Sequence, residues 1–181
     1  SVKSSHTFFE SPITLTPEQT VADAASLINK RSHGAIVIVD ACQSVPHIPV
    51  DVTELGADFL AFSGHKILGP TGVGVLWGRY ELLNELPPFL FGGSMIDSVE
   101  MESATWAELP RKFEAGVPNM AQAVGLGAAV DYLNKVGMAN IHDHEMVLTK
   151  QLLAGLQHLQ GVKVIGPTDL VNRGGVVSFV I

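Results

Sequence analysis

The chain has 181 residues, of which 46% are hydrophobic and 16% charged, and its formal net charge is −7. This composition is typical of an α/β protein with a large buried sheet, and it does not favour nucleic-acid binding because the longest basic run is only Lys30-Arg31. The single cysteine, Cys42, excludes an internal disulfide and fits a reducing cytoplasm. No segment has the length and apolar character of a signal peptide or a membrane span, so we expect a cytoplasmic protein with no membrane partner.

The first predicted elements lie within residues 1–40. Residues 13–17 predict a short extended piece, and Thr16 is suited to cap a helix that Gly34 ends. Residues 35–40 form the continuous apolar run AIVIVD, which predicts a strand buried on both faces and hence a parallel sheet.

Strands and helices alternate along the rest of the chain. Residues 89–118 predict a long irregular stretch, and loops of this length are usually functional. Because the chain stops at Ile181 within an apolar strand pattern, we expect it to be a piece of a longer protein. The other predicted elements are a helical crossover (49–56), a second buried strand running into a loop (57–66), a third strand (73–78), a short helix (80–86), two long helices (121–137 and 140–159) and two final strands.

Polar side chains follow the two predicted buried strands at the point where each strand ends. Asp40 and Gln43 follow the first strand, and Ser63, His65 and Lys66 follow the second. If the two strands are parallel neighbours, both sets lie at their carboxyl ends, where open α/β sheets bind ligands.

These residue types match the needs of pyridoxal 5′-phosphate (PLP). The cofactor needs a lysine that bonds to its aldehyde, a carboxylate that keeps its pyridine nitrogen protonated, and hydroxyl or imidazole donors for its phosphate. Lys66, Asp40, Ser63 and His65 supply these groups, and Gln43 supplies a hydrogen bond for the ring phenolate oxygen. In an extended segment Ser63 and His65 would project to one side and Lys66 to the other.

The segment VDACQSVPHIPVDVTELGADFLAFSGHKILGPTGVGVLWGR resembles the PLP-lysine region of class V aminotransferase-fold enzymes, and most of all the cysteine desulfurases and the related selenocysteine lyases. PPFLFGGSMI, KFEAGVPN and AVGLGAAVDYL match the same family, so the resemblance covers roughly residues 36–181. It implies an α/β fold: the C-terminal half of a PLP-dependent transferase large domain, with a mostly parallel sheet and helices, and the start of a small α/β domain. We expect an atypical helix–strand segment at 1–39, the PLP-binding portion of the large domain at 40–118, and a connecting helix with the start of the small C-terminal domain at 119–181.

The resemblance also implies residue roles and a reaction. Lys66 is then the catalytic, cofactor-bound lysine, Asp40 the partner of the pyridine nitrogen and Gln43 the partner of the phenolate oxygen, while Ser63 and His65 bind the phosphate. The implied enzyme is a homodimeric PLP-dependent sulfurtransferase that converts L-cysteine to L-alanine and passes the sulfur as persulfide to a protein acceptor for iron–sulfur cluster assembly.

Two departures from the family pattern affect this expectation. The persulfide-forming cysteine of the family lies on a loop beyond residue 181, and Cys42 does not match it, so we expect the piece alone to be inactive. Val117 stands where the family commonly has threonine, whose hydroxyl is thought to reach the phosphate of the partner subunit.

Residues 1–39 fit this family less well and weakly resemble half of a CBS module, which suggests a foreign segment. A non-catalytic, nucleotide-binding CBS-like module is therefore one alternative function. A selenocysteine lyase or another class V aminotransferase is the alternative among PLP enzymes.

Other residue patterns give weaker signals. His142, His144 and Glu145 resemble metal ligands, but histidines two apart on a helix point to different faces, so we expect a solvated helix face and no metal. GPTGVG lacks the Lys-Ser/Thr of a phosphate-binding loop and is interpreted as a turn. Cys42 is interpreted as a small buried filler and His47 as a loop residue.

Overall fold

The computed structural model describes residues 36–171 and 173–181, so the elements expected before residue 36 lie outside the described residues. The described residues form three small sheets and two long helices. The strands are β1 (Ile38–Asp40), β2 (Phe59–Ser63), β3 (Gly74–Gly78), β4 (Ile96–Val99), β5 (Ala104–Trp106), β6 (Lys163–Ile165) and β7 (Ser178–Val180). The α-helices are α2 (Val52–Leu55), α3 (Tyr80–Glu85), α4 (Met120–Val136) and α5 (Met138–Gln157), and the 3-10 helices are η1 (Gly64–Ile67) and η2 (Arg111–Phe113).

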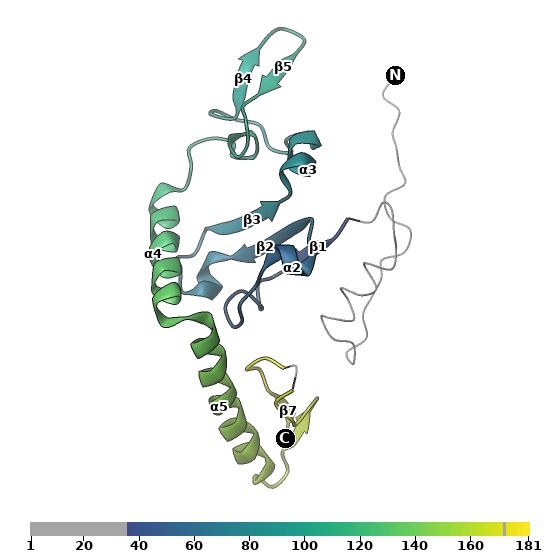
Figure 1. The fold of residues 1–181 in the computed structure, drawn as a ribbon, viewed down its shortest axis with the longest axis vertical. Helices are drawn as coiled ribbons and strands as arrows, with labels where there is room; N and C mark the ends of the chain where they lie inside the picture. Colours follow the sequence, from purple (N-terminus) through teal and green to yellow (C-terminus); the bar gives the residue numbers. More distant parts are fainter. Residues whose placement is uncertain (1–35, 172) are drawn as a thin grey trace. The chain divides into compact units, whose positions relative to one another are not determined.

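The central sheet has the strand order β1-β2-β3 (Figure 1). β1 pairs with β2 in parallel, with Val39 opposite Leu60, and β2 pairs with β3 in the antiparallel direction. The prediction that the first two strands are parallel neighbours is therefore confirmed. The short crossover between them, predicted for residues 49–56, contains α2.

Burial of β1 differs from the prediction. Within the described residues β1 pairs only with β2, and Ile38 is 69% exposed. The expectation of a strand buried on both faces is wrong for this strand. Phe59 and Leu60 of β2 are buried, as predicted, because β2 has a neighbour on each side.

The buried Asp58 holds together the starts of β1 and β2 and the end of the antiparallel strand β3. Its carboxylate accepts a hydrogen bond from the Val37 backbone N–H at 2.9 Å and forms an ion pair with Arg79 at 3.2 Å. One side chain before β2 therefore contacts the residue before β1 and the residue after β3.

Helix α2 begins and ends at residues suited to those positions. The Asp51 side chain accepts hydrogen bonds from the backbone N–H groups of Thr53 and Glu54, at 2.7 and 3.2 Å, and these bonds hold the pKa of its carboxyl below the ordinary value. The helix ends at Gly56, whose φ of +62° is in the left-handed region that glycine adopts without strain.

The stretch 89–118, predicted to be irregular, contains a β-hairpin and a 3-10 helix. β4 and β5 pair in the antiparallel direction, and the hydroxyls of Ser98 and Thr105 lie 2.6 Å apart across the hairpin. Every residue of β4 is exposed, so the apolar alternation that reveals a half-buried strand is missing. The prediction of a structureless stretch is therefore wrong.

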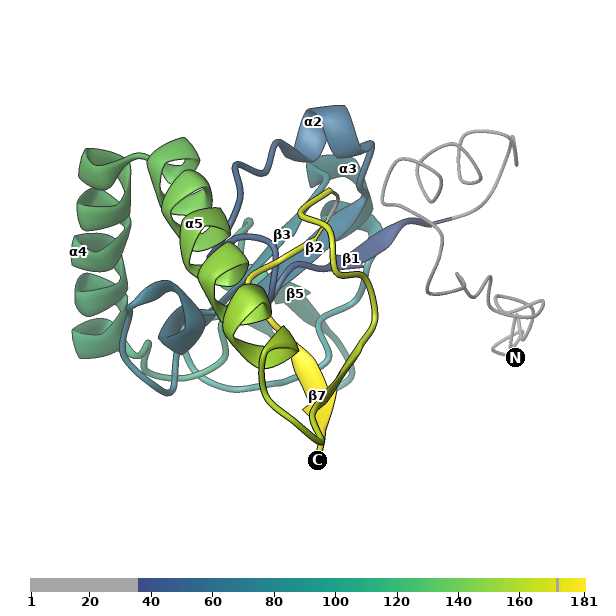
Figure 2. The same ribbon diagram turned by 90° about the horizontal axis from the view of Figure 1, so that it is seen from below.

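Helix α4 lies beside the central sheet, and α5 continues from its end toward the C-terminal strands (Figures 1 and 2). They meet at Gly137, whose φ is +87°. Leu126 and Leu133 of α4 pack with Ile67 of η1 in the main apolar cluster, and partly buried residues of the sheet and of α5 surround it. The segment around Lys66 is therefore attached to the core through its neighbour Ile67.

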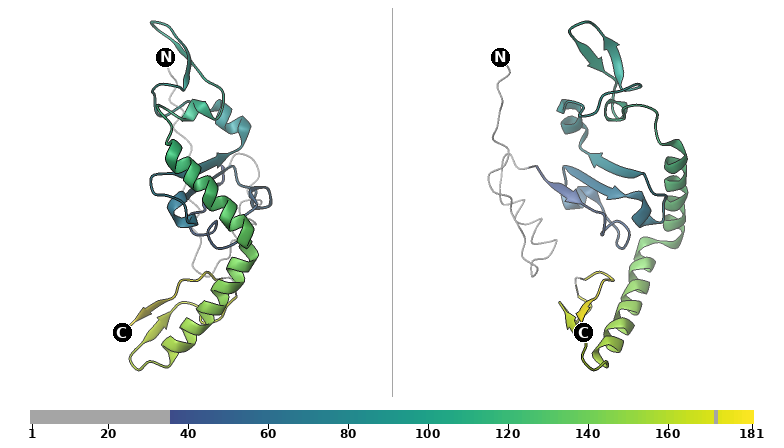
Figure 3. Two further views of the ribbon diagram at one scale, coloured as in Figure 1. Left: turned by 90° about the vertical axis from the view of Figure 1, so that its left-hand side faces the viewer. Right: turned by 180° about the vertical axis from the view of Figure 1, so that it is seen from behind.

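The last two predicted strands are confirmed as the antiparallel pair β6–β7, which contacts the end of α5. Figure 3 shows this pair and the β4–β5 hairpin at opposite ends of the described residues.

Candidate functional site

The carboxyl ends of β1 and β2 lie side by side, as the parallel pairing requires. Asp40, the last residue of β1, is in register with Ala61, and the Ala41 backbone N–H donates to the Ala61 carbonyl at 2.8 Å. Beyond this point β2 continues for two residues to Ser63, and η1 follows. The predicted site residues after the two strands therefore share one edge of the sheet.

Cys42 connects the two strand ends. Its backbone N–H donates a hydrogen bond to Asp40 Oδ1 at 3.0 Å, and its Sγ lies 3.4 Å from the Ser63 hydroxyl oxygen. The side chain is half-buried. Cys42 is thus a hydrogen-bonding residue between two predicted cofactor ligands, rather than the buried filler expected from the sequence.

The Asp40 carboxylate is stabilised in its ionised form. The backbone N–H of Cys42 contributes most, then the Cys42 side chain, and the positive charge of Lys66 adds to them, so the pKa of Asp40 lies below its ordinary value. Asp40 is therefore an anion at neutral pH, and Lys66 is close enough to act on its charge.

Lys66 lies in the 3-10 helix η1, not in an extended segment. The expected alternation of Ser63 and His65 on one side and Lys66 on the other is therefore wrong, because side chains in a 3-10 helix rotate by about a third of a turn per residue. His65 and Lys66 are both exposed, whereas Gly64 before them and Ile67 after them are buried. Gly64 and Ile67 are thus packed into the protein, and His65 and Lys66 between them face outward.

Close packing fixes the course of this turn. A Cβ on Gly64 would lie 2.8 Å from the Val73 carbonyl oxygen, and a Cβ on Gly125 of α4 would lie 2.7 Å from Pro70 Cγ. Asn119, in the KFEAGVPN motif, donates from Nδ2 to the Gly72 carbonyl at 2.6 Å. The start of α4 therefore packs against the loop that follows Lys66 and is hydrogen-bonded to it.

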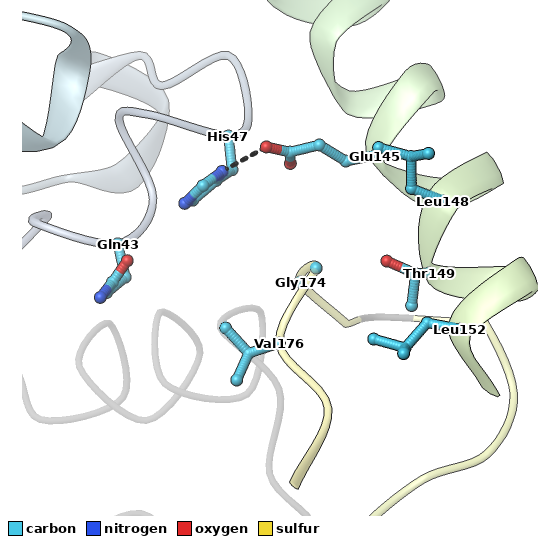
Figure 4. Close-up of a pocket in the computed structure, with 9 residues that line it drawn as sticks. Gln43, His47, Glu145, Leu148, Thr149, Leu152, Gly174 and Val176 are labelled. Carbon is cyan, nitrogen blue, oxygen red and sulfur yellow. Dashed lines mark hydrogen bonds and ion pairs between the residues drawn. The ribbon is translucent and has the colours of Figure 1, made fainter. Parts of the chain in front are cut away.

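Two neighbouring cavities open beside the site, and His47 and Glu145 line both of them. The larger cavity has a volume of about 570 Å³ and is lined by Gln43, by Leu148, Thr149 and Leu152 of α5, and by the 174–176 segment (Figure 4). The smaller cavity, of about 270 Å³, is lined by Lys66 and Tyr132 among others.

The contact between His47 and Glu145 was missed from the sequence. Glu145 Oε1 of α5 lies 2.6 Å from His47 Nδ1, and the two side chains are only 35% (His47) and 24% (Glu145) exposed (Figure 4). The predicted solvated face holds for His144, which is exposed, but is wrong for His142 and Glu145, which are half-buried. The two partners are 98 residues apart, so no local pattern could have revealed the pair.

The structure thus brings some of the predicted residues together and leaves others apart. Asp40 and Ser63 are connected through Cys42, and Lys66 acts on Asp40 through its charge. Gln43 lines a different cavity from Lys66, and His65 is exposed. The set offers one carboxylate, one amine, one hydroxyl, one imidazole and one amide at a single edge, which is the donor set that PLP requires.

Residues 36–171 and 173–181 contain no group of three or more His, Cys, Asp or Glu side chains placed to hold a metal ion. Within the same residues, no helix combines the length and the apolar character needed to cross a membrane.

Comparison with known proteins places these observations in a family. A probable cysteine desulfurase of Streptomyces coelicolor is 57% identical over 146 residues, which cover 81% of this chain and 35% of the relative. The structure of an apo cysteine desulfurase from Thermococcus onnurineus NA1 matches with a TM-score of 0.82 and 41% identity, over 89% of this chain and 40% of the other. A mutant of the protein C-DES, with glycine covalently linked to its PLP cofactor, matches with a TM-score of 0.73 and 29% identity, over 86% of this chain and 42% of the other.

The chain therefore spans only about a third of the length of the curated relative, at 35%. The family model for class V aminotransferases matches residues 16–181, so the match begins earlier than residue 36, where the motifs first indicated it, and includes most of the segment considered foreign. The mixed α/β fold, the parallel pair that ends in Asp40 and Ser63, and this match agree: the chain belongs to the class V aminotransferase family.

Proposed function

We propose that this chain carries the lysine-bearing part of the PLP site of a cysteine desulfurase, which converts L-cysteine to L-alanine and passes the sulfur on as a persulfide. The observation that carries the proposal is that Asp40 ends β1 and Lys66 follows the end of the adjacent parallel strand β2, near enough for its charge to help lower the pKa of Asp40. The 57% identity to a probable cysteine desulfurase supports the choice of reaction.

Bound PLP would supply an electron-withdrawing ring that stabilises negative charge on the substrate carbon. In the proposal, Asp40 keeps a proton on the ring nitrogen, because its lowered pKa makes it an anion at neutral pH. The Lys66 amine would hold the cofactor through its aldehyde and would carry a proton to and from the substrate carbon. Ser63 and His65 would donate hydrogen bonds to the phosphate, and the Gln43 amide would bind the phenolate oxygen.

Several site residues are exposed in this piece of chain, namely Asp40, Gln43, His65 and Lys66. They would form one wall of the cofactor site. We propose that the other walls come from parts of the protein outside the 181 residues, which agrees with the chain covering 35% of the relative. The same proposal makes the whole enzyme a cytoplasmic homodimer that serves iron–sulfur cluster assembly through a protein sulfur acceptor.

The test is covalent labelling of the purified 181-residue chain. PLP is added, the lysine–cofactor bond is reduced with borohydride, and the labelled residue is located by mass spectrometry. We expect the label on Lys66, with visible absorbance before reduction that is lost in Lys66→Ala. Lys150→Ala is the matched control, because Lys150 is exposed on α5 and lines neither of the two cavities, and its loss should leave the absorbance unchanged.

Label on another lysine, or absorbance that survives in Lys66→Ala, would contradict the assignment. A thermal-shift comparison of PLP with AMP addresses the CBS-like alternative, since stabilisation by AMP alone would favour a nucleotide-binding module. Selenocysteine in place of cysteine as the substrate of the whole enzyme tests the selenocysteine lyase alternative.

A further inference from the structure

The pair His47–Glu145 joins the loop after β1 to helix α5. His47 Nδ1 and Glu145 Oε1 lie 2.6 Å apart, and both side chains are partly withdrawn from water. Figure 4 shows the pair at the top of the larger cavity, with Gln43 on the His47 side. The pair lines the larger cavity together with Gln43 and the smaller cavity together with Lys66. It therefore adjoins both of these residues of the proposed cofactor site.

Glu145 depends on His47 for its orientation. Its second oxygen, Oε2, is buried and has no hydrogen-bond partner in the described part of the chain, and the same holds for His142 Nδ1 one turn earlier on α5. Hydrogen bonds to a charged group are stronger than neutral ones, and more so away from water. The His47 contact is therefore the interaction that fixes this carboxylate among the described residues.

The loop that carries Gln43 is a compact series of turns with two attachment points. Its first end is attached to the sheet by the hydrogen bond from the Ala41 N–H to Ala61. Inside the loop, Val45 N–H donates to the Ala41 carbonyl at 3.1 Å, and His47 N–H donates to the Ser44 carbonyl at 3.0 Å. Its far end is attached to α5 by the His47 side chain, and the exposed Gln43 lies between the two attachments.

We infer that His47 is a positioning residue: its hydrogen bond to Glu145 holds the 41–48 loop in the form that presents Gln43 to the cofactor. The inference rests on the proposed function, since Gln43 is the group through which His47 acts. His47 itself does not touch the cofactor in this account.

Two nearly isosteric substitutions isolate the hydrogen bond. Asparagine places a polar side-chain atom close to the position of His47 Nδ1, and leucine has a similar shape without a polar group. His47→Leu should weaken PLP binding by roughly tenfold and shift the visible absorbance of the bound cofactor in the same direction as Gln43→Leu. His47→Asn should restore both properties. The matched controls are His144→Leu and His144→Asn, on the exposed face of α5, which should bind PLP like the unchanged chain.

A double-mutant cycle tests the route of the effect. If His47 acts through Gln43, His47→Leu should add nothing to Gln43→Leu, whereas independent contributions would add. Equal behaviour of His47→Leu and His47→Asn, or additive effects in the cycle, would overturn the inference.

Hydrogen exchange of the cofactor-free chain separates this inference from the proposed function. In His47→Leu the amides of Val45, His47 and Ile48 should exchange faster than in His47→Asn, because the loop has lost its far attachment. If His47→Leu alone does not fold, His47→Leu/Glu145→Leu removes the buried carboxylate with its partner and should show the same faster exchange. PLP bound to a lysine other than Lys66 would reject the proposed function, whereas equal exchange in these variants would reject the positioning role.

Discussion

Replacement of Gly64 by alanine is a sharp test of the packing that positions Lys66. The added Cβ would lie 2.8 Å from the Val73 carbonyl oxygen, 2.9 Å from Val73 Cγ1 and 3.4 Å from Leu126 Cδ1. The Val73 oxygen belongs to the backbone and accepts the Gly64 N–H at 2.9 Å, so the strain is relieved only if the end of β2 and the start of β3 move apart. Such overpacking costs about 1–3 kcal/mol of the free energy of unfolding.

Urea denaturation followed by circular dichroism measures this loss, and PLP absorbance measures the displacement of Lys66. Gly127→Ala is the matched control, because no atom lies within 4 Å of its added Cβ and the residue is exposed in the middle of α4. There alanine should stabilise the helix by up to about 1 kcal/mol. A Gly64→Ala variant as stable as the Gly127→Ala variant, with unchanged PLP binding, would refute the packing argument.

Three further predictions concern the core and the Asp40 carboxylate. Leu126→Ala, in the apolar cluster under η1, should lower the free energy of unfolding by about 2–5 kcal/mol in urea denaturation, whereas Val124→Ala, at an exposed position of the same helix, should change it by less than about 0.5 kcal/mol. In an NMR titration, Cys42→Ala should raise the pKa of Asp40 only part of the way to its ordinary value, because the backbone N–H of residue 42, which lowers this pKa most, remains. A return of the Asp40 pKa to its ordinary value would contradict this prediction. Because the pKa of Asp40 is lowered in the folded state, its ionised form stabilises the fold above about pH 4, and this contribution is lost as the pH falls through the lowered pKa. Asp40→Asn should therefore make the free energy of unfolding less dependent on acid pH. An identical pH dependence in the variant would contradict this prediction.

Much of the fold was predictable because its signals are local. The apolar run that ends at Asp40 and the one that ends at Ser63 indicated neighbouring strands, and the structure pairs them in parallel. The proline pair after residue 86 ended α3, and the small-residue pattern of 121–137 indicated α4. The β4–β5 hairpin was not predictable, because every residue of β4 and all of β5 except Trp106 are exposed and no apolar alternation marks it.

The sequence by itself determined which groups follow the two strands, and with them the class of cofactor and the family, because motifs such as SGHK and VDACQ are contiguous in the chain. Only the tertiary structure decided how these groups are held. The 3-10 turn at Lys66 depends on close packing against Val73, just before β3, and against Leu126 of α4. The link from Asp40 to Ser63 depends on the Cys42 thiol, and His47 pairs with Glu145, 98 residues away. Each of these depends on contacts between segments distant in sequence, and the local patterns of residue type and spacing carry no information about such contacts.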